Sequence, residues 1–107
     1  MNYEKLTQKS AECLRASQSL AVEKGNQQIT SLHILSSLIS DPDGIIYQIL
    51  NDLNINFDYL KRDLEQAINA LPKISPINEA YFAPETDRML NLAENIAKQM
   101  KDEYVSV

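Results

Sequence analysis

The sequence is poor in the residues that build disulfides and metal sites. Its 107 residues include one cysteine, Cys13, and one histidine, His33. No internal disulfide can therefore form, and the common zinc sites, which need three or four cysteine or histidine ligands, cannot be completed. A single unpaired cysteine is typical of a reducing compartment. We expect a cytoplasmic protein that binds no metal and carries no cofactor of its own.

Glycine is also scarce, and this bears on nucleotide binding. The two glycines, Gly25 and Gly44, stand 19 positions apart and neither belongs to a glycine-rich run. A P-loop needs such a run, ending in Gly-Lys-Ser/Thr, so that backbone amides can surround the phosphates. The chain is in addition too short for an ATPase module with a lid. We expect no nucleotide site and no catalysis in this chain.

Basic residues and long apolar runs are limited too. Ten Lys and Arg stand against 15 Asp and Glu, which gives a net charge of −5. Non-specific binding to a phosphate backbone depends on neutralising it with Lys and Arg, so nucleic acid is not an expected partner. No stretch approaches the 18 apolar residues of a membrane span, and the start MNYEKLTQKS has no apolar core of a secretion signal. We expect no membrane association.

The few chemically versatile side chains have structural interpretations. Cys13 occupies an inward-facing position of a predicted helix, and free cysteine is usually a small core residue rather than a nucleophile. We expect His33 to hydrogen-bond the connector near Thr30 rather than to bind a ligand. Calcium is not expected, because the aspartate spacing does not fit an EF-hand loop. We interpret these aspartates as turn and cap residues: Asp41, Asp43 and Asp52.

What the sequence has in quantity is helical periodicity. Small and apolar residues recur at steps of three and four after Thr7, which predicts a first helix with Thr7 as its N-cap and Gly25 at its end. Thr30 is predicted to cap a second, short helix. The buried stripe expected on this helix consists of Leu35, Leu38 and Ile39.

Two more helices are predicted before the first proline-rich stretch. The turn Asp41-Pro42-Asp43-Gly44 breaks the chain. A third helix follows with Ile45, Ile46, Ile49, Leu50 and Leu53. A fourth carries Phe57, Leu60, Leu64, Ala67, Ile68 and Leu71, and Pro72 stops it. Strand signals are nearly absent, so the fold class is all-α.

Residues 72–83 are predicted to be a linker, because three of the four prolines lie in PKISPINEAYFAP and exclude regular helix or central strand. Pro84 then suits the first turn of a last helix, whose acidic residues Glu85 and Asp87 complement the helix dipole. The buried face expected on this helix consists of Met89, Ala93, Ile96, Ala97 and Met100.

A weak internal repeat links the two ends of the sequence. Residues 6–30 are echoed 76 positions later by residues 82–106, so that Leu14 falls on Leu90 and Ala21 on Ala97. The first copy continues into the apolar segment SLHILSSLI, whereas the sequence ends before a counterpart in the second copy. A period of this length fits stacked helical units. We expect one complete unit over residues 1–71 and the truncated start of a second over 84–107.

Four runs carry a resemblance to a known family. The runs LTQKSAECLRASQSLA, GNQQITSLHILSSLI, LPKISP and LNLAENIAKQMKDEYVSV together resemble the amino-terminal repeat domain of Clp ATPases. Among its branches, the segments ASQSLA, LPKIS and DEYVS are most similar to the disaggregating chaperone ClpB. One departure is Leu32, where many relatives carry an acidic residue before the histidine.

The resemblance implies a non-catalytic domain made of two pseudo-repeats of about four helices each. In the family it lies in front of two ATPase modules, which use ATP and magnesium in a homohexameric ring, and the full-length parent carries a coiled coil. The domain receives unfolded or aggregated polypeptide, in cooperation with an Hsp70-type chaperone system in the stress response. The alternative that the family leaves open is an adaptor-docking or assembly module, as in the ClpA and ClpC branches.

The candidate binding residues lie on the expected surface between the repeats. The resemblance places Thr7 and Asp102 beside a groove that meets client chains, although Thr7 is also an N-cap. Tyr81 and Phe82 form a second candidate patch, since exposed aromatics can hold unfolded segments without sequence specificity. Phe82 also occupies the position of a hydrophobic staple, so Tyr81 is the freer of the two.

The truncated second unit also predicts an assembly property. Its apolar helix over residues 84–100 is short of partners within the sequence, and an unpaired apolar stripe tends to be covered by another chain. We therefore expect self-association of the chain, or a loosely held last helix.

Overall fold

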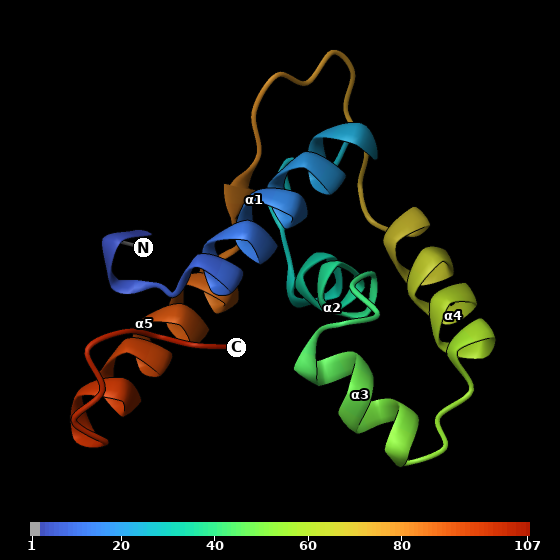
Figure 1. Cartoon of the computed structure of the whole chain (residues 1–107). Coiled ribbons are helices and arrows are strands. Elements are labelled where there is room, and N and C mark those ends of the chain that lie inside the picture. The colour runs from blue at the N-terminus through green and yellow to red at the C-terminus, as the bar shows by residue number, and fades with distance from the viewer. Residues whose placement is uncertain (1–2) are drawn as a thin grey trace.

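The computed structural model describes residues 3–107 and contains five α-helices in that range (Figure 1). The helices are α1 Gln8–Glu23, α2 Ser31–Ile39, α3 Ile45–Asp52, α4 Phe57–Asn69 and α5 Pro84–Gln99, after a short 3-10 turn η1 Tyr3–Lys5. Two strands of two residues each, β1 Gln28–Ile29 and β2 Tyr81–Phe82, complete the described elements. The all-α prediction is confirmed.

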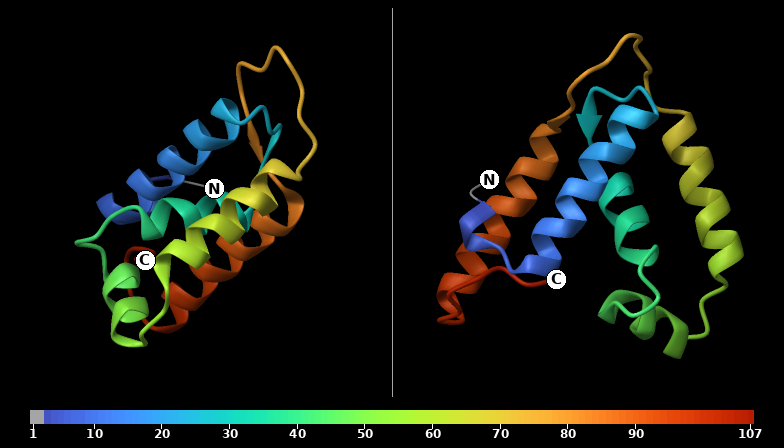
Figure 2. Two further views of the ribbon diagram at one scale, coloured as in Figure 1. Left: turned by 90° about the vertical axis from the view of Figure 1, so that its right-hand side faces the viewer. Right: turned by 45° about the horizontal axis from the view of Figure 1, so that its top comes forward.

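Four of the helices lie next to one another, and α3 runs across the ends of two of them, α2 and α4 (Figure 2). The right-hand view of Figure 2 shows α5, α1, α2 and α4 in that order, with α3 below α2 and α4. Helix α2 packs against α1, α3 and α4. The molecule measures 42 × 34 × 20 Å, so its thinnest dimension equals about two helix diameters. A layer this thin leaves most helices with one exposed face.

Local capping explains where α1 begins and ends. The Thr7 hydroxyl accepts a hydrogen bond from the Ser10 N–H at 3.3 Å, which confirms Thr7 as N-cap. Gly25 follows the helix with φ +74°, and the Asn26 N–H donates to the Ala21 carbonyl at 2.8 Å. This is the Schellman arrangement, in which glycine is favoured because a left-handed residue has no Cβ penalty there.

The internal repeat has an equivalent in the backbone. Helix α1 spans residues 8–23, and a shift of 76 gives residues 84–99, which are the bounds of α5. The end of α5 also repeats the Schellman motif: Lys101 has φ +59°, and the Asp102 N–H donates to the Ala97 carbonyl at 2.8 Å. The two halves of the repeat therefore share helix length and helix termination.

The strand pairs show that the two halves are related by an approximate twofold axis. In the parallel pair of β1 and β2, Ile29 lies opposite Phe82. A shift of 76 turns Ile29 into Val105 and, in the other direction, Phe82 into Leu6, and Leu6 indeed forms a parallel bridge with Val105. In each pair, the segment before the helix of one half lies beside the segment after the helix of the other half. A twofold relation between the repeats produces such reciprocal pairs.

The core of the described residues includes two clusters that meet at Phe82. The first contains the equivalent residues Leu14 and Leu90 together with Leu6 and Ala11. The second contains Ala21, Ile29 and Ala80. Phe82 is half-buried and packs against both clusters. The aromatic ring before α5 therefore joins the two halves of the repeat.

The structure corrects one predicted helix boundary and one predicted buried stripe. The linker predicted at 72–83 stays a prediction, and its last part forms the short strand β2 on β1. The fourth helix ends at Asn69, before Leu71. On α2 the buried side chains are His33 and Ile39, while Leu35 and Leu38 are half-buried. The reason is that polar contacts at the N-terminus of α2 place the histidine inward.

The predicted buried face of α5 is also wrong in part. The buried residues of this helix are Thr86 and Leu90, and Ala93 and Ala97 are half-buried. Met89, Ile96 and Met100, which periodicity placed in the core, are between 41% and 66% exposed. No helix follows α5 within the described residues to cover this face.

Candidate functional site

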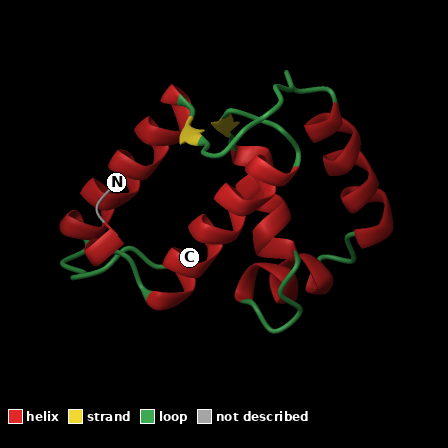
Figure 3. Cartoon of the chain, turned by 90° about the horizontal axis from the view of Figure 1, so that it is seen from above, coloured by secondary structure: helices red, strands yellow, loops and turns green. Residues whose placement is uncertain are grey.

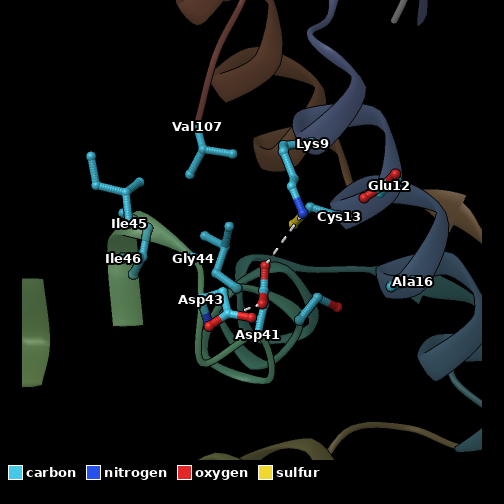
Figure 4. Close-up of a pocket in the computed structure, with 12 residues that line it drawn as sticks. Lys9, Glu12, Cys13, Ala16, Asp41, Asp43, Gly44, Ile45, Ile46 and Val107 are labelled. Carbon is cyan, nitrogen blue, oxygen red and sulfur yellow. Dashed lines mark hydrogen bonds and ion pairs between the residues drawn. The ribbon is translucent and has the colours of Figure 1, made fainter. Parts of the chain in front are cut away.

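A groove between α1 and the turn from α2 into α3 is the candidate site (Figure 4). Its volume is about 530 Å³. One wall is the N-terminal half of α1 and the other is the end of α2 with the turn into α3. Val107 closes one side of it. Residues far apart in the sequence therefore meet here.

A tight turn sets the shape of the groove. The Asp43 N–H donates to the Asp41 carboxylate at 3.1 Å, and the Gly44 N–H donates to the Asp41 carbonyl at 3.0 Å. A Cβ on Gly44 would lie 3.1 Å from that same carbonyl oxygen, so glycine permits this close approach. The turn predicted at residues 41–44 is confirmed. It brings Ile45 and Ile46 to the groove opposite α1.

The groove has apolar walls and an acidic rim. Its apolar residues are Cys13, Ala16, Leu38, Ile45, Ile46 and Val107. Glu12, Asp41 and Asp43 contribute carboxylates, and Lys9 is the one basic residue among those that line it. The Lys9 Nζ lies 3.8 Å from Asp41 Oδ2, and the two side chains are 74% and 42% exposed, so water screens this pair and it contributes about 0–1 kcal/mol.

Cys13 lies in the wall of this groove rather than in the core. Its side chain is half-buried, and the thiol lies 3.8 Å from the Ile34 carbonyl oxygen. The prediction of a core residue was therefore only half right. Burial raises the pKa of the Cys13 thiol, although a hydrogen bond with Ser17 opposes the shift. A protonated thiol is a weak nucleophile, which agrees with the expectation that Cys13 is not catalytic.

His33 has the structural role that the sequence predicts. The ring is fully buried; its Nδ1 accepts from the Thr30 N–H at 2.9 Å, and Nε2 lies 3.0 Å from Asn26 Oδ1. Asn26 in turn donates through Nδ2 to the Pro72 carbonyl at 3.1 Å. Burial lowers the pKa of His33. The neutral imidazole therefore joins the start of α2, the connector after α1 and the segment after α4.

Two of the predicted binding residues lie in neighbouring segments. The Thr7 N–H donates to the Val105 carbonyl at 2.9 Å, and the Thr7 Oγ1 is occupied by the backbone and hydroxyl of Ser10. Asp102 is exposed, three residues before Val105. The bridge between Leu6 and Val105 thus joins the segments that carry the two candidates.

The aromatic pair Tyr81–Phe82 divides its two side chains between surface and core. Tyr81 is 56% exposed, and its hydroxyl donates to the Glu79 carboxylate at 3.2 Å. Phe82 packs into both core clusters. It is not a staple, because the fourth residue of α5 is Asp87, which offers no apolar partner. Tyr81 is accessible to a partner, whereas most of the Phe82 ring is committed to the core.

Sequence reasoning did not identify the groove. Its residues come from α1, from the turn after α2 and from Val107, and nothing in the periodicity of one helix shows that these segments meet. One signal was present: the Asp-Pro-Asp-Gly turn stands between two apolar helices and supplies two of the rim carboxylates. Binding residues lie disproportionately on surface loops that a rigid scaffold positions.

Two helices carry apolar stripes that the described chain leaves exposed. On α3 the residues Ile45, Ile49 and Leu53 are between 47% and 65% exposed. On α5 the stripe consists of Met89, Leu92, Ile96 and Met100. Figure 1 labels both helices at the lower edge of the molecule, and Figure 3 shows the same chain from above. A domain of this size seldom exposes so many large apolar side chains along its helices without using them.

Among residues 3–107, no helix has the length and apolar character that crossing a membrane requires. Within the same range, no three His, Cys, Asp or Glu side chains converge closely enough to hold a metal ion.

Comparison with known proteins gives the family. The family model of the Clp repeat (R) N-terminal domain matches residues 5–107. The chaperone protein ClpB of Clostridium tetani is 34% identical over the whole of this chain, which spans 13% of the length of that relative.

Solved structures agree on the fold. The N-terminal domain of Hsp104 from Candida albicans superposes with a TM-score of 0.83 at 20% identity, covering 95% of this chain and 67% of that one. A ClpV N-domain solved as a complex with a VipB peptide has a TM-score of 0.74 at 20% identity, covering 95% and 62%. Since the family model matches nearly the whole chain and the relative is similar throughout, the chain belongs to the Clp repeat N-terminal domain family.

Proposed function

We propose that this chain is the non-catalytic N-terminal domain of a ClpB-like, ATP-dependent disaggregase, and that it binds unfolded or aggregated polypeptide for delivery to the ATPase ring. The observation that carries the proposal is the amount of apolar side chain left exposed on α3 and α5. Unfolded chains differ from folded ones in exposing apolar residues. A surface with accessible Ile, Leu and Met side chains can therefore select them without reading a sequence.

The wider setting belongs to the same proposal. The parent would be a cytoplasmic homohexamer whose ATPase modules bind ATP and magnesium and which cooperates with an Hsp70-type system. Residues 1–71 would be the first repeat, 72–83 the linker and 84–107 the start of the second repeat. The similarity to ClpB chaperones, of which this chain spans 13%, supports this setting.

The test compares unfolded and folded forms of one client. We expect the chain to bind a fluorescently labelled, permanently unfolded protein and to ignore the folded form of the same protein. The double variant Ile49→Ser, Ile96→Ser removes one exposed apolar side chain from each stripe and should weaken binding several-fold. The matched control Gln48→Ser, Asn95→Ser changes neighbouring exposed residues and should leave binding unchanged. Equal binding of both client forms would contradict the proposal.

An adaptor-docking function is the second candidate. The observation in its favour is that the ClpV N-domain, a structural neighbour, was solved in complex with a defined peptide. A docking module binds one folded partner at a saturable site and does not discriminate unfolded clients. Saturable binding to a single folded protein, with no affinity for unfolded chains, would replace the first function by this one.

Among the earlier candidate residues, Asp102 and Tyr81 are the ones we propose to contact clients. Both side chains are exposed, and a carboxylate can accept hydrogen bonds from an extended backbone. Thr7 and Phe82 are retained as candidates with a mainly structural contribution. Replacing Asp102 by Asn and Tyr81 by Ala should reduce client affinity without changing the unfolding midpoint by more than a few degrees.

Self-association of the isolated chain also remains a proposal. The exposed stripe on α5 would be covered in a second copy, or α5 would be held loosely. Light scattering as a function of concentration distinguishes a monomer from a dimer, and hydrogen exchange reports how firmly α5 is held. A monomer with strong protection across residues 84–100 would contradict both versions.

A further inference from the structure

We propose that the groove between α1 and the turn into α3 binds a client segment that combines an aliphatic residue with a neighbouring Lys or Arg. This inference rests on the proposed client-binding function and names the site and the class of segment. It concerns the groove of about 530 Å³ shown in Figure 4, which shares Ile45 with the exposed stripe on α3 and no residue with the stripe on α5.

The walls of the groove explain why the bound segment should contain an aliphatic residue. Cys13 and Ala16 of α1 line one wall of the groove, and Leu38, Ile45 and Ile46 line it from the end of α2 and the start of α3. A volume of about 530 Å³ lies within the range of natural ligand pockets and holds several aliphatic side chains. Water in such a space gains few hydrogen bonds from the walls, so an aliphatic side chain replaces it favourably.

The rim of the groove explains why the bound segment should also contain a Lys or Arg. Three carboxylates, of Glu12, Asp41 and Asp43, line the groove with one ammonium, of Lys9. Lys9 is directed to Asp41, so the carboxylates of Glu12 and Asp43 have no basic partner among the interactions described. The net charge of the rim is therefore −2, from three negative charges and one positive. A cationic residue beside the aliphatic anchor is attracted, and an acidic one is repelled.

Charge also separates this occupant from a second copy of the chain. The chain carries −5 overall, so a copy approaching the acidic rim meets repulsion at long range. A basic client segment meets attraction. The proposed occupant of the groove is therefore a cationic, aliphatic peptide segment. Occupation of the groove by a second copy is a different result that the test can detect.

Cys13 provides a reporter inside the site. It is the single cysteine of the chain, it is half-buried and it lines the groove. A maleimide reagent therefore reads the accessibility of this groove alone. Three cysteine-free peptides of equal length serve as probes: one with Leu and Lys, one with each Lys replaced by Glu, and one with each Leu replaced by Ser. Affinity is measured by fluorescence anisotropy, and the rate of Cys13 modification is measured at saturating peptide.

We expect the Leu–Lys peptide to bind most tightly and to slow Cys13 modification at least about fivefold, and both replacement peptides to bind and protect less. Binding without protection of Cys13 would overturn this inference and leave the client-binding function in place. If none of the peptides binds and unfolded protein does not bind either, the proposed client-binding function itself is overturned. Protection that needs no peptide and grows with chain concentration would mean that a second copy occupies the groove, and would also overturn the inference.

Charge-neutralising variants test the rim directly. The double variant Glu12→Gln, Asp43→Asn should weaken binding of the Leu–Lys peptide about fivefold, because it removes two charges that attract the Lys side chains, and it should reduce the salt dependence of binding. The matched control Glu23→Gln, Asp63→Asn removes the same two charges from exposed positions of α1 and α4 outside the groove. Equal losses in the two variants would show a net-charge effect and contradict a local site.

Discussion

Helices α1 and α5 are equivalent by sequence and by backbone, yet they differ in how much of their surface is covered. Ser17 and Ala21 on α1 are fully buried, while their equivalents Ala93 and Ala97 on α5 are half-buried. The cause is α2, which packs on α1, whereas no helix of the described chain packs on α5 in the same way. Burial at equivalent positions is therefore set by what the neighbouring segment covers.

The connectors after the two helices show the same contrast in polar groups. Asn26 is buried, and its amide bridges His33 and the Pro72 carbonyl. Its equivalent Asp102 is exposed to solvent. An amide can satisfy both a donor and an acceptor inside the protein, while a carboxylate without a partner is costly to bury. The residue types at the two positions thus match their environments.

The largest expected effect is a difference in the loss of stability between substitutions at two equivalent aliphatic residues, one in each half of the repeat. Ile29→Ala should lower the free energy of unfolding by about 3 kcal/mol, because Ile29 is 1% exposed in the second core cluster. Val105→Ala, at the equivalent position, should cost about 1 kcal/mol because Val105 is half-buried. Urea denaturation of both variants gives the two values. Equal losses would mean that the two halves are covered to the same extent.

The next effect concerns His33. His33→Ala should cost about 2 kcal/mol, since it leaves the Thr30 N–H and the Asn26 carbonyl of a buried network without a partner. The pKa of His33 is lowered in the folded state, so the unfolded state binds the proton first. Stability should then fall as pH decreases below the ordinary histidine value of about 6.5.

The pH dependence has an internal control. His33 is the only histidine of the sequence, so His33→Ala should flatten the part of the stability profile just below the ordinary histidine pKa of about 6.5. Unfolding midpoints measured at intervals across this range provide the comparison. An unchanged slope in the variant would show that other groups cause the dependence.

The smallest expected effect is a change in stability of opposite sign at the left-handed residue that ends each of the two equivalent helices. Gly25→Ala should destabilise by about 1 kcal/mol, because Gly25 has φ +74° and an added Cβ would lie 3.1 Å from the Ile74 carbonyl oxygen. Lys101 occupies the equivalent left-handed position with φ +59°, so Lys101→Gly should stabilise by up to about 1 kcal/mol. Thermal unfolding of the two variants should shift the midpoint in opposite directions.

Much of the local structure was predictable. Thr7, Gly25 and Thr30 at helix ends, the turn before Ile45 and Pro84 at the start of α5 each act through their own backbone and near neighbours, and the structure confirms them. The structural role of His33 beside Thr30 is a contact between near neighbours as well. Such features depend on capping and turn geometry, which a short window of sequence contains.

The errors lie where distant segments meet. Periodicity placed Met89 and Met100 in the core, but a periodic stripe shows which face is apolar and not whether another element covers it. The strand at Tyr81–Phe82 needs Gln28–Ile29 as its partner, more than 50 residues away. The groove likewise combines α1 with Val107. These pairings depend on long-range packing, which local propensity does not contain.

The sequence by itself determined the helices, their caps, the register of the internal repeat and the absence of a P-loop, because each depends on residue types at short or fixed spacing. Only the tertiary structure decided which apolar faces are covered and that α1, the turn after α2 and Val107 enclose one acidic, apolar groove. The physical reason is that burial and cavities arise from the crossing of elements far apart in the chain. The bridge between Leu6 and Val105 is one such long-range pairing, and it holds the segment that ends in Val107 next to the start of α1.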